Sequence, residues 1–217
     1  MPYIGNDVVD WKLPANAGKS WDSRYLRKIL TNAEIEIVQE AENQDRALWS
    51  LWACKETAYK VVRKTSVGAP FLPRLWSVQL KQSGHTVMEG EVVLPGGSTV
   101  FVQLSAENYV HCIGADRLRD LEQIIWGVEP VPETGSCVNI DPSLHGRKCL
   151  LRKLSDVHQL DFREMEIRRA KKGLEFQPPY LYYKNEKAPF DISLSHDGKF
   201  VAYAFIKQLS CTHAILN

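Results

Sequence analysis

The spacing of the apolar residues changes from a helical to a strand pattern, and this change limits the fold more than any other feature. Between residues 31 and 63 apolar residues recur every three or four positions, and Thr31 and Glu34 form a capping box, the pattern with which a helix begins. A second helix is expected to begin near Asp45. Between residues 76 and 113 apolar and polar residues alternate, with Ser83-Gly84 and Pro95-Gly96-Gly97 at turns. The pattern predicts helices packed on an antiparallel meander.

A similar succession follows in the rest of the chain. Residues 117–126 and about 150–174 are compatible with helices, and residues 190–196 and 200–206 read as strands joined at Asp197-Gly198, a strong hairpin signal. Residues 101–113 can also be aligned with residues 191–203 with a small gap. This weak internal similarity fits two related halves.

We therefore expect an α+β fold of two similar subdomains, each with helices packed on a small antiparallel sheet, related by a pseudo-twofold. The first subdomain is expected over residues 1–126 and the second over residues 141–217. Residues 127–140 contain a proline-rich segment and Gly135-Ser136, and are expected to form the linker.

The composition of the 217 residues, 44% of them hydrophobic, suits one sizeable core or two smaller ones. The longest apolar stretches, such as residues 201–206, are far shorter than the roughly 20 residues that cross a bilayer, and the first residues lack the pattern of a signal peptide. The five cysteines include no CxxC pair, which argues against a disulfide framework and a structural zinc site. We expect a cytoplasmic protein with no membrane partner.

The formal net charge of +1 hides a basic segment between residues 147 and 172. Its cations are Arg147, Lys148, Arg152, Lys153, Arg163, Arg168, Arg169, Lys171 and Lys172. A surface of this kind suits a small polyanion, whereas a nucleic-acid-binding domain is normally more basic overall. We expect no nucleic-acid partner.

The first of three chemical clusters is Gly5-Asn6-Asp7-Val8-Val9-Asp10 at the end of the opening strand. A glycine allows close approach of the backbone to a ligand, and a carboxylate at a strand end suits magnesium, which prefers oxygen ligands. Considered alone, an exposed aspartate beside a glycine is more often a turn residue.

The second cluster is Trp52-Ala53-Cys54-Lys55-Glu56-Thr57-Ala58-Tyr59-Lys60 on the predicted helix. Glu56 and Lys60 are four residues apart and share one helix face, so a carboxylate and an ammonium are presented together. The simpler interpretation is an ordinary helical ion pair.

The third cluster is Ile192-Ser193-Leu194-Ser195-His196-Asp197-Gly198 at the predicted hairpin. Strand alternation puts Ser193 and Ser195 on one face and leaves His196 at the mouth of the turn. Hydroxyl groups and an imidazole there could hold phosphate oxygens, although a lone turn histidine usually has no such role. A serine hydrolase is disfavoured because no GxSxG elbow is present.

Gly-x-Asp near the start, W-x-x-K-E-x-x-x-K on a helix and S-x-S-H-D-G before a strand resemble, as a set, the motifs of the 4′-phosphopantetheinyl transferase superfamily. The resemblance covers the three segments closely and the rest of the chain loosely. It implies an enzyme that transfers 4′-phosphopantetheine from coenzyme A to a serine of an acyl or peptidyl carrier protein, with Mg²⁺ as cofactor, releasing 3′,5′-ADP. It also implies a holo-[acyl-carrier-protein] synthase type of activity.

The resemblance further assigns roles to individual residues. Asp7 and Glu56 would bind magnesium, Lys60 and His196 would contact the phosphates of coenzyme A, and Lys55 would support the same site. Asp10 is a weaker metal candidate. Ser193 and Ser195 match the serines of the coenzyme pocket. The basic run from Arg168 to Lys172, together with Lys187, would hold the 3′-phosphate, face an acidic carrier helix, or simply be solvated.

Two departures from the family pattern affect this interpretation. Thr57 stands where members usually have alanine. The motif order is that of the short holo-acyl-carrier-protein synthase type, which forms its site between chains, yet this chain is long. Two fused short units, working as a monomeric pseudo-dimer, would explain why a long chain has the motif order of the short type.

The implied reaction begins when a carrier serine attacks the β-phosphate of coenzyme A. Glu56 is our hypothesis for the base, acting directly or through water, and Lys60 would stabilise the leaving phosphate. The carrier could come from fatty-acid, polyketide or peptide synthesis. The alternatives are a non-catalytic adaptor that binds coenzyme A or a carrier, and an unrelated nucleotide-binding protein.

Overall fold

The computed structural model describes residues 2–66, 68–84, 86–132, 140–173 and 175–208. The first half begins with β1 (Ile4–Val9), then η1 (Lys19–Trp21), α1 (Ser23–Ile29), α2 (Asn32–Glu40), α3 (Gln44–Thr65) and η2 (Pro73–Leu75). It continues with β2 (Ser77–Gln82), β3 (Val87–Val93), β4 (Thr99–Ala106) and β5 (Val110–Ala115). The predicted helices and meander are therefore confirmed, as is the capping box of Thr31 and Glu34 at the start of α2.

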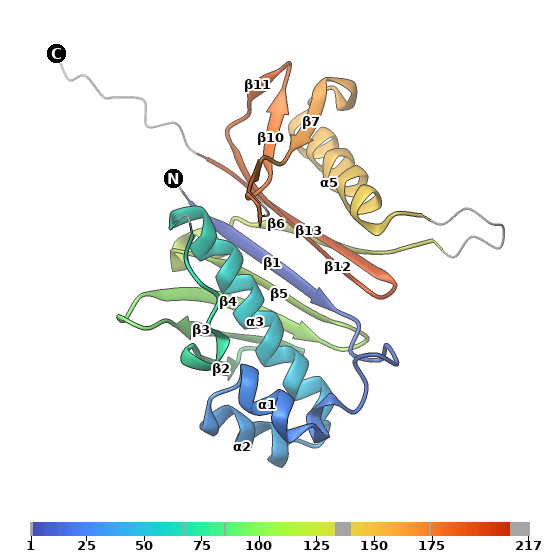
Figure 1. Cartoon of the computed structure of the whole chain (residues 1–217). Helices are drawn as coiled ribbons and strands as arrows, with labels where there is room; N and C mark the ends of the chain where they lie inside the picture. Colours follow the sequence, from blue (N-terminus) through green and yellow to red (C-terminus); the bar gives the residue numbers. More distant parts are fainter. Residues whose placement is uncertain (1, 67, 85, 133–139, 174, 209–217) are drawn as a thin grey trace.

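The strands of the first half form one antiparallel sheet in the order β1-β5-β4-β3-β2. The helix α3 covers one face of this sheet (Figure 1). Apolar residues of α3 and the strands, among them Leu48, Val61, Val102 and Leu104, are buried between them. This packing makes α3 a rigid support for any side chain on its remaining faces.

Two glycines allow α3 to approach the sheet closely. Gly5 and Gly114 face each other across β1 and β5, and both lie against Thr57 of α3. A Cβ atom at position 5 would lie 2.2 Å from the Thr57 carbonyl oxygen, and one at position 114 would lie 2.8 Å from Thr57 Cγ2. Thr57 is fully buried and its hydroxyl donates to the Cys112 carbonyl oxygen at 3.3 Å. Gly114, which pairs with Gly5, thus leaves room for the side chain of Thr57.

The second half contains one long helix and three small sheets. Its elements are α4 (Leu118–Leu121), β6 (Ile125–Pro130), α5 (Pro142–His158), η3 (Phe162–Glu164), β7 (Met165–Arg168), β8 (Lys171–Lys172), β9 (Glu175–Phe176), β10 (Tyr180–Tyr183), β11 (Glu186–Lys187), β12 (Phe190–Asp197) and β13 (Phe200–Lys207). The sheets have the orders β12-β13-β6, β11-β10-β7 and β8-β9. The pairing β6-β13-β12 repeats the order β1-β5-β4 of the first half. The α+β class with helices on antiparallel sheets is confirmed, and the pseudo-twofold stays a prediction.

Two predicted helices of the second half are wrong in extent. The helix expected over 117–126 is only α4, because residues 125–130 form β6 and pair with β13. The first residues of the expected linker, 127–130, therefore lie inside a sheet; residues 133–139 lie outside the described residues. The helix expected over 150–174 begins at Pro142, capped by Asp141, and ends at His158. Beyond it, alternating burial of Met165 and Ile167 makes a strand.

The hairpin predicted at Asp197-Gly198 is confirmed with a shift of one residue. Asp197 pairs with Phe200, so the two turn residues are Gly198 and Lys199. Gly198 has a φ of 52°, in the left-handed region that favours glycine.

The two halves meet where β1 lies beside β12 (Figure 1). No backbone ladder joins these two strands among the described residues. Instead, side chains of β12 accept hydrogen bonds from backbone N–H groups of the β1 segment, at 2.7 Å for Ile4 to Asp191 Oδ2 and 2.9 Å for Asn6 to Ser193 Oγ. We call this contact, between residues 4–10 and residues 191–197, the seam. An apolar cluster that includes Ile4, Ile113, Ala204 and Ile206 lies beside it.

No helix within the described ranges is both long and apolar enough to span a lipid bilayer.

The close approach of α3 to β1 predicts a large effect of Gly5→Ala. The new methyl group meets a backbone carbonyl, which cannot rotate away, so we expect a loss of about 2–3 kcal/mol in the free energy of unfolding. Gly84→Ala is the control, since its nearest neighbour would be 4.0 Å away, and it should change stability by less than about 0.5 kcal/mol. Urea denaturation measures both, and equal effects would contradict the packing described.

Candidate functional site

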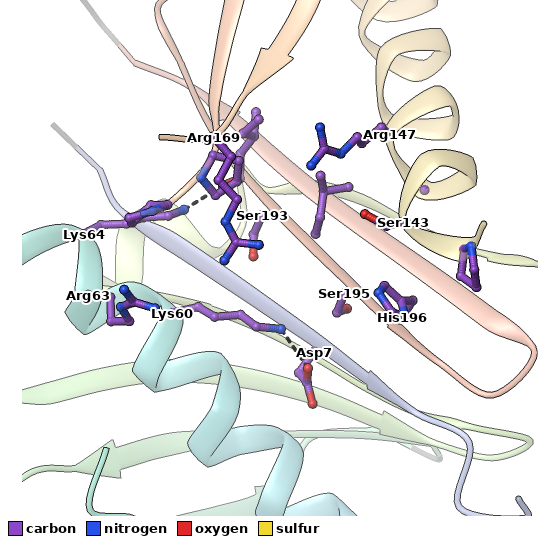
Figure 2. Close-up of a pocket in the computed structure, with 16 residues that line it drawn as sticks. Asp7, Lys60, Arg63, Lys64, Ser143, Arg147, Arg169, Ser193, Ser195 and His196 are labelled. Atoms are coloured by element: carbon purple, nitrogen blue, oxygen red, sulfur yellow. Dashed lines mark hydrogen bonds and ion pairs between the residues drawn. The ribbon is translucent and has the colours of Figure 1, made fainter. Parts of the chain in front are cut away.

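A cavity of about 300 Å³ opens at the seam and takes its walls from both halves. The first half contributes β1 and α3, and the second half contributes the start of α5, the chain after β7 and the strand β12 (Figure 2). Its charged and polar lining residues are Asp7, Lys60, Arg63, Lys64, Ser143, Arg147, Arg169, Ser193, Ser195 and His196. Five of these are cations and one is an acid, so the cavity suits an anionic ligand.

Lys60 joins α3 to the middle of β1, so Asp7 lies within the strand and not at its end as the sequence suggested (Figure 2). Its ammonium nitrogen Nζ donates to the Asn6 carbonyl oxygen at 2.7 Å and to Asp7 Oδ1 at 2.8 Å. The expected pairing of Glu56 with Lys60 is therefore not the principal contact of this lysine, which instead contacts the Gly-x-Asp motif. Lys60 thus links two of the three sequence clusters.

Asp7 and Glu56 form an acidic pair beside the cavity. Burial raises the pKa of Asp7, Lys60 opposes this shift, and Asp197 adds to it. Glu56 is half-buried on α3, one turn before Lys60. Burial, followed by the charge of Asp7, raises the pKa of Glu56 to about 7, while Lys60 acts in the opposite sense. Glu56 is not a lining residue of the cavity, but it is close enough to Asp7 to sense its charge.

The donor set of this pair fits a magnesium ion. Magnesium takes one or two carboxylates, keeps several waters and completes its shell with substrate phosphates, so two carboxylates suffice. The hydrogen bond from Lys60 to Asp7 uses the carboxylate oxygen Oδ1 and not Oδ2. Within the part of the chain that the structure describes, no group of three or more His, Cys, Asp or Glu residues could hold a metal. A site fully enclosed by protein ligands is therefore not found there.

The strand β12 brings Ser193, Ser195 and His196 to the opposite wall. Ser193 is buried, and its oxygen accepts the Asn6 backbone N–H, while the Ser195 oxygen accepts from Asn6 Nδ2 at 3.2 Å. Each hydroxyl keeps its own proton to donate to a ligand. His196 is exposed and faces the cavity near the turn (Figure 2).

Lys55 does not belong to this site, which corrects the role that the resemblance implied. It is fully buried, and its Nζ contacts Glu34 Oε2 at 2.6 Å, the Ile29 carbonyl oxygen at 2.9 Å and the Pro73 carbonyl oxygen at 2.8 Å. All three ammonium protons are thereby used. Lys55 ties α3 to the end of α1, to α2 and to η2, and it does not line the cavity.

Three further expected residues lie outside the cavity lining. Asp10 is buried beneath the hairpin turn, where a Cβ atom on Gly198 would lie 2.6 Å from its Oδ2. Arg168 contacts Glu166 at 2.7 Å and stacks over Tyr182 on the sheet of β7 and β10. Lys187 of β11 lies 3.7 Å from the ring centroid of Tyr180. Arg168 and Lys187 project from one face of this sheet, and neither lines the cavity.

Three arginines come together at the cavity: Arg147 and Arg169, which the sequence placed only in a general basic segment, and Arg63, which no sequence pattern singled out. Arg63 comes from α3, Arg147 from α5 and Arg169 from the segment after β7 (Figure 2). Burial lowers the pKa of Arg169, and the charges of Arg63 and Arg147 lower it further. We call these residues the arginine cluster. Like charges gathered in a partly buried place favour a bound anion. The spacing of Lys60 and Arg63 on α3 could have indicated Arg63, whereas Arg147 and Arg169 depend on tertiary contacts.

Comparison with known proteins gives a family and similar solved structures. A family model described as the 4′-phosphopantetheinyl transferase superfamily matches residues 3–113. Among solved structures, the holo-[acyl-carrier-protein] synthase of Thermotoga maritima is similar with 13% sequence identity and a TM-score of 0.38, over 86% of each chain. No curated protein matches the chain. Because the family model spans half of the sequence and includes both the Gly-x-Asp and the Lys-Glu motifs, the chain belongs to the 4′-phosphopantetheinyl transferase superfamily.

Proposed function

We propose that this protein transfers the 4′-phosphopantetheine group of coenzyme A to a serine of an acyl or peptidyl carrier protein, with magnesium, and releases 3′,5′-ADP. The observation that carries the proposal is the cavity at the seam, where the acidic pair lies beside five cations. Coenzyme A has the complementary chemistry, since it carries a diphosphate and a separate 3′-phosphate. The same motifs occur in the family to which the chain belongs.

The cations offer two separate places for phosphate groups. Lys60 and His196 flank Asp7 and would contact the diphosphate. The arginine cluster is the best candidate for the 3′-phosphate, because guanidinium groups bind phosphate oxygens in a fixed fork geometry. This assignment replaces Arg168 and Lys187, which project elsewhere.

The transfer forms one bond and breaks one. The carrier serine oxygen attacks the β-phosphorus, and the bond between that phosphorus and the oxygen of 3′,5′-ADP breaks. Glu56 takes the serine proton, and a pKa of about 7 suits a general base near neutral pH. Lys60 stabilises the charge on the leaving phosphate. Asp7 and Glu56 would supply the carboxylate oxygens for magnesium, which neutralises charge on the diphosphate when bound.

The direct test is incubation of the protein with coenzyme A, magnesium and an apo carrier protein. Mass spectrometry should show the gain of one phosphopantetheine group on the carrier, and Glu56→Ala should abolish it because the base and a metal donor are lost. Glu36→Ala, which removes an exposed acid of α2, is the control and should transfer normally. Normal transfer by Glu56→Ala would contradict the assigned role.

The adaptor alternative gives a different result in the same experiment. An adaptor binds coenzyme A or the carrier by calorimetry, but no mass is transferred by the wild-type protein. A nucleotide-binding protein of another kind would bind ADP or ATP as tightly as coenzyme A.

The arginine cluster predicts a dependence on the 3′-phosphate. Arg147→Ala should raise the KM for coenzyme A about tenfold or more, because a charge-assisted hydrogen bond is lost, and should leave the KM for 3′-dephospho-coenzyme A unchanged. Arg168→Ala is the matched control, an arginine beside Arg169 that projects away from the cavity. Steady-state kinetics with both coenzymes measure the difference, and an equal effect of Arg147→Ala on both would contradict this placement.

The raised pKa of Glu56 predicts how stability depends on pH in the metal-free protein. Between about pH 4.5 and pH 7 the folded protein holds a proton on Glu56 that the unfolded chain has released, so the free energy of unfolding falls as the pH rises through this range. Glu56→Gln should make this fall shallower. Urea denaturation at several pH values, with a chelator present, measures the free energy of unfolding. An identical pH dependence in the wild type and in Glu56→Gln would disprove the raised pKa of Glu56.

A further inference from the structure

Within the described ranges, the strand β1 has one edge that no other strand pairs through its backbone. Its other edge forms the ladder with β5, whereas β12 runs alongside without backbone pairing. Buried N–H groups on such an edge require partners. Asp191, Ser193 and Asp197 of β12 supply them, accepting from Ile4, Asn6 and Asp10, and each donor and acceptor are 187 residues apart. The constant separation means that the two segments are held in one parallel register.

Asp191 is the one of these three acceptors for which the structure also gives an ion pair, with Lys64. The residue is 6% exposed, and its Oδ2 accepts both the Ile4 N–H at 2.7 Å and a hydrogen bond from Lys64 Nζ at 2.8 Å. Lys64 also donates to the carbonyl oxygens of Ile4 at 2.6 Å and Ile192 at 2.8 Å. One buried ion pair thus ties together β1, α3 and β12.

This arrangement commits Lys64 to the seam. Although Lys64 lines the cavity, its ammonium group already has three acceptors, as many as its protons can serve. It therefore differs from Lys60, whose ammonium group donates to two acceptors, the Asn6 carbonyl oxygen and Asp7 Oδ1. Its part in the site is to hold the two walls together.

The two walls carry different parts of the proposed machinery. Asp7 is three residues beyond Ile4 on β1, and Ser193, Ser195 and His196 follow Asp191 on β12. Any slip or opening of the seam changes the separation of Asp7 and His196. Displacements of about 1 Å in a reacting geometry can reduce rates by about a hundredfold.

We propose that Asp191 is a positioning residue, which through Ile4 and Lys64 fixes the register of β1 against β12 and so sets the separation of the two walls of the cavity. This inference rests on the proposed function for its catalytic consequence. A buried ion pair alone is weak evidence of stabilisation, so the consequence expected is geometric.

The test compares Asp191→Asn with Asp116→Asn. Asp116 Oδ1 accepts the N–H of Tyr3 at 2.9 Å, so it also caps the backbone beside the start of β1, but it follows β5 and lies in the first half. Dissociation constants for coenzyme A with magnesium, and kcat/KM for transfer, are measured at a temperature where all the proteins are folded. Asp191→Asn should weaken binding and lower kcat/KM by about tenfold or more, and Asp116→Asn should leave both near the wild-type values.

Equal values for the two variants, whether both intact or both impaired, would overturn the inference. If Asp191→Asn does not fold, Asp197→Asn takes its place, because Asp197 Oδ2 accepts from Asp10 N and Asn16 Nδ2 at the other end of the seam. Asp197→Asn should likewise weaken the binding of coenzyme A and lower kcat/KM for transfer by about tenfold or more.

Amide hydrogen exchange gives a reading that does not require transfer activity. Asp191→Asn should speed the exchange of the Ile4 and Asn6 amides, which face β12. The amides of residues 108–115, in the second arm of the hairpin of β4 and β5, should be affected less. Unchanged exchange at Ile4 and Asn6 would overturn the role of Asp191. A wild-type protein that neither binds coenzyme A nor transfers the group would instead overturn the proposed function, and the exchange result would still decide whether Asp191 sets the register.

Discussion

The site depends on the way β12 satisfies the free edge of β1 with side chains instead of a backbone ladder. Hydroxyl and carboxylate oxygens at alternate positions of β12 accept the N–H groups of β1, so a side chain lies between the two backbones at each of these contacts. That additional separation leaves room for a cavity between the halves, while the regular spacing still fixes the register. The apolar cluster of Ile4, Ile113, Ala204 and Ile206 supports the same contact from one side. A conventional ladder would have closed the place where the cations and the acidic pair now meet.

The electrostatics of the cavity are unbalanced without a ligand. Burial, followed by the charges of Arg63 and Arg147, lowers the pKa of Arg169, and burial, followed by the charge of Asp7, raises the pKa of Glu56, so like charges are held near one another at both ends. A diphosphate with a divalent cation would relieve both, because the metal compensates the carboxylates and the phosphates compensate the cations. Repulsion between like charges that are held on several rigid elements is typical of a site preorganised for a charged ligand.

Local patterns of the sequence predicted the first half of the fold well, because capping residues, helical spacing and alternation all agree there. The second half was harder, since Ile125–Pro130 and Met165–Arg168 are short strands whose pairing partners are distant in sequence. The three motifs predicted that Asp7, Lys60 and His196 share one place. The direction in which Lys55 and Arg168 project could not be predicted from them, because one step along a helix or strand turns a side chain to another face. Arg147 and Arg169 required knowledge of how α5 and β7 pack.

The central claim is that one diphosphate lies between walls drawn from both halves. A crystal structure of the protein with coenzyme A and magnesium tests it most directly. The account predicts the diphosphate between Asp7 with Lys60 on one side and His196 on the other, with the metal at the carboxylates of Asp7 and Glu56 and the 3′-phosphate at the arginine cluster. Coenzyme A bound away from the seam, or a diphosphate that contacts residues of one half alone, would contradict it.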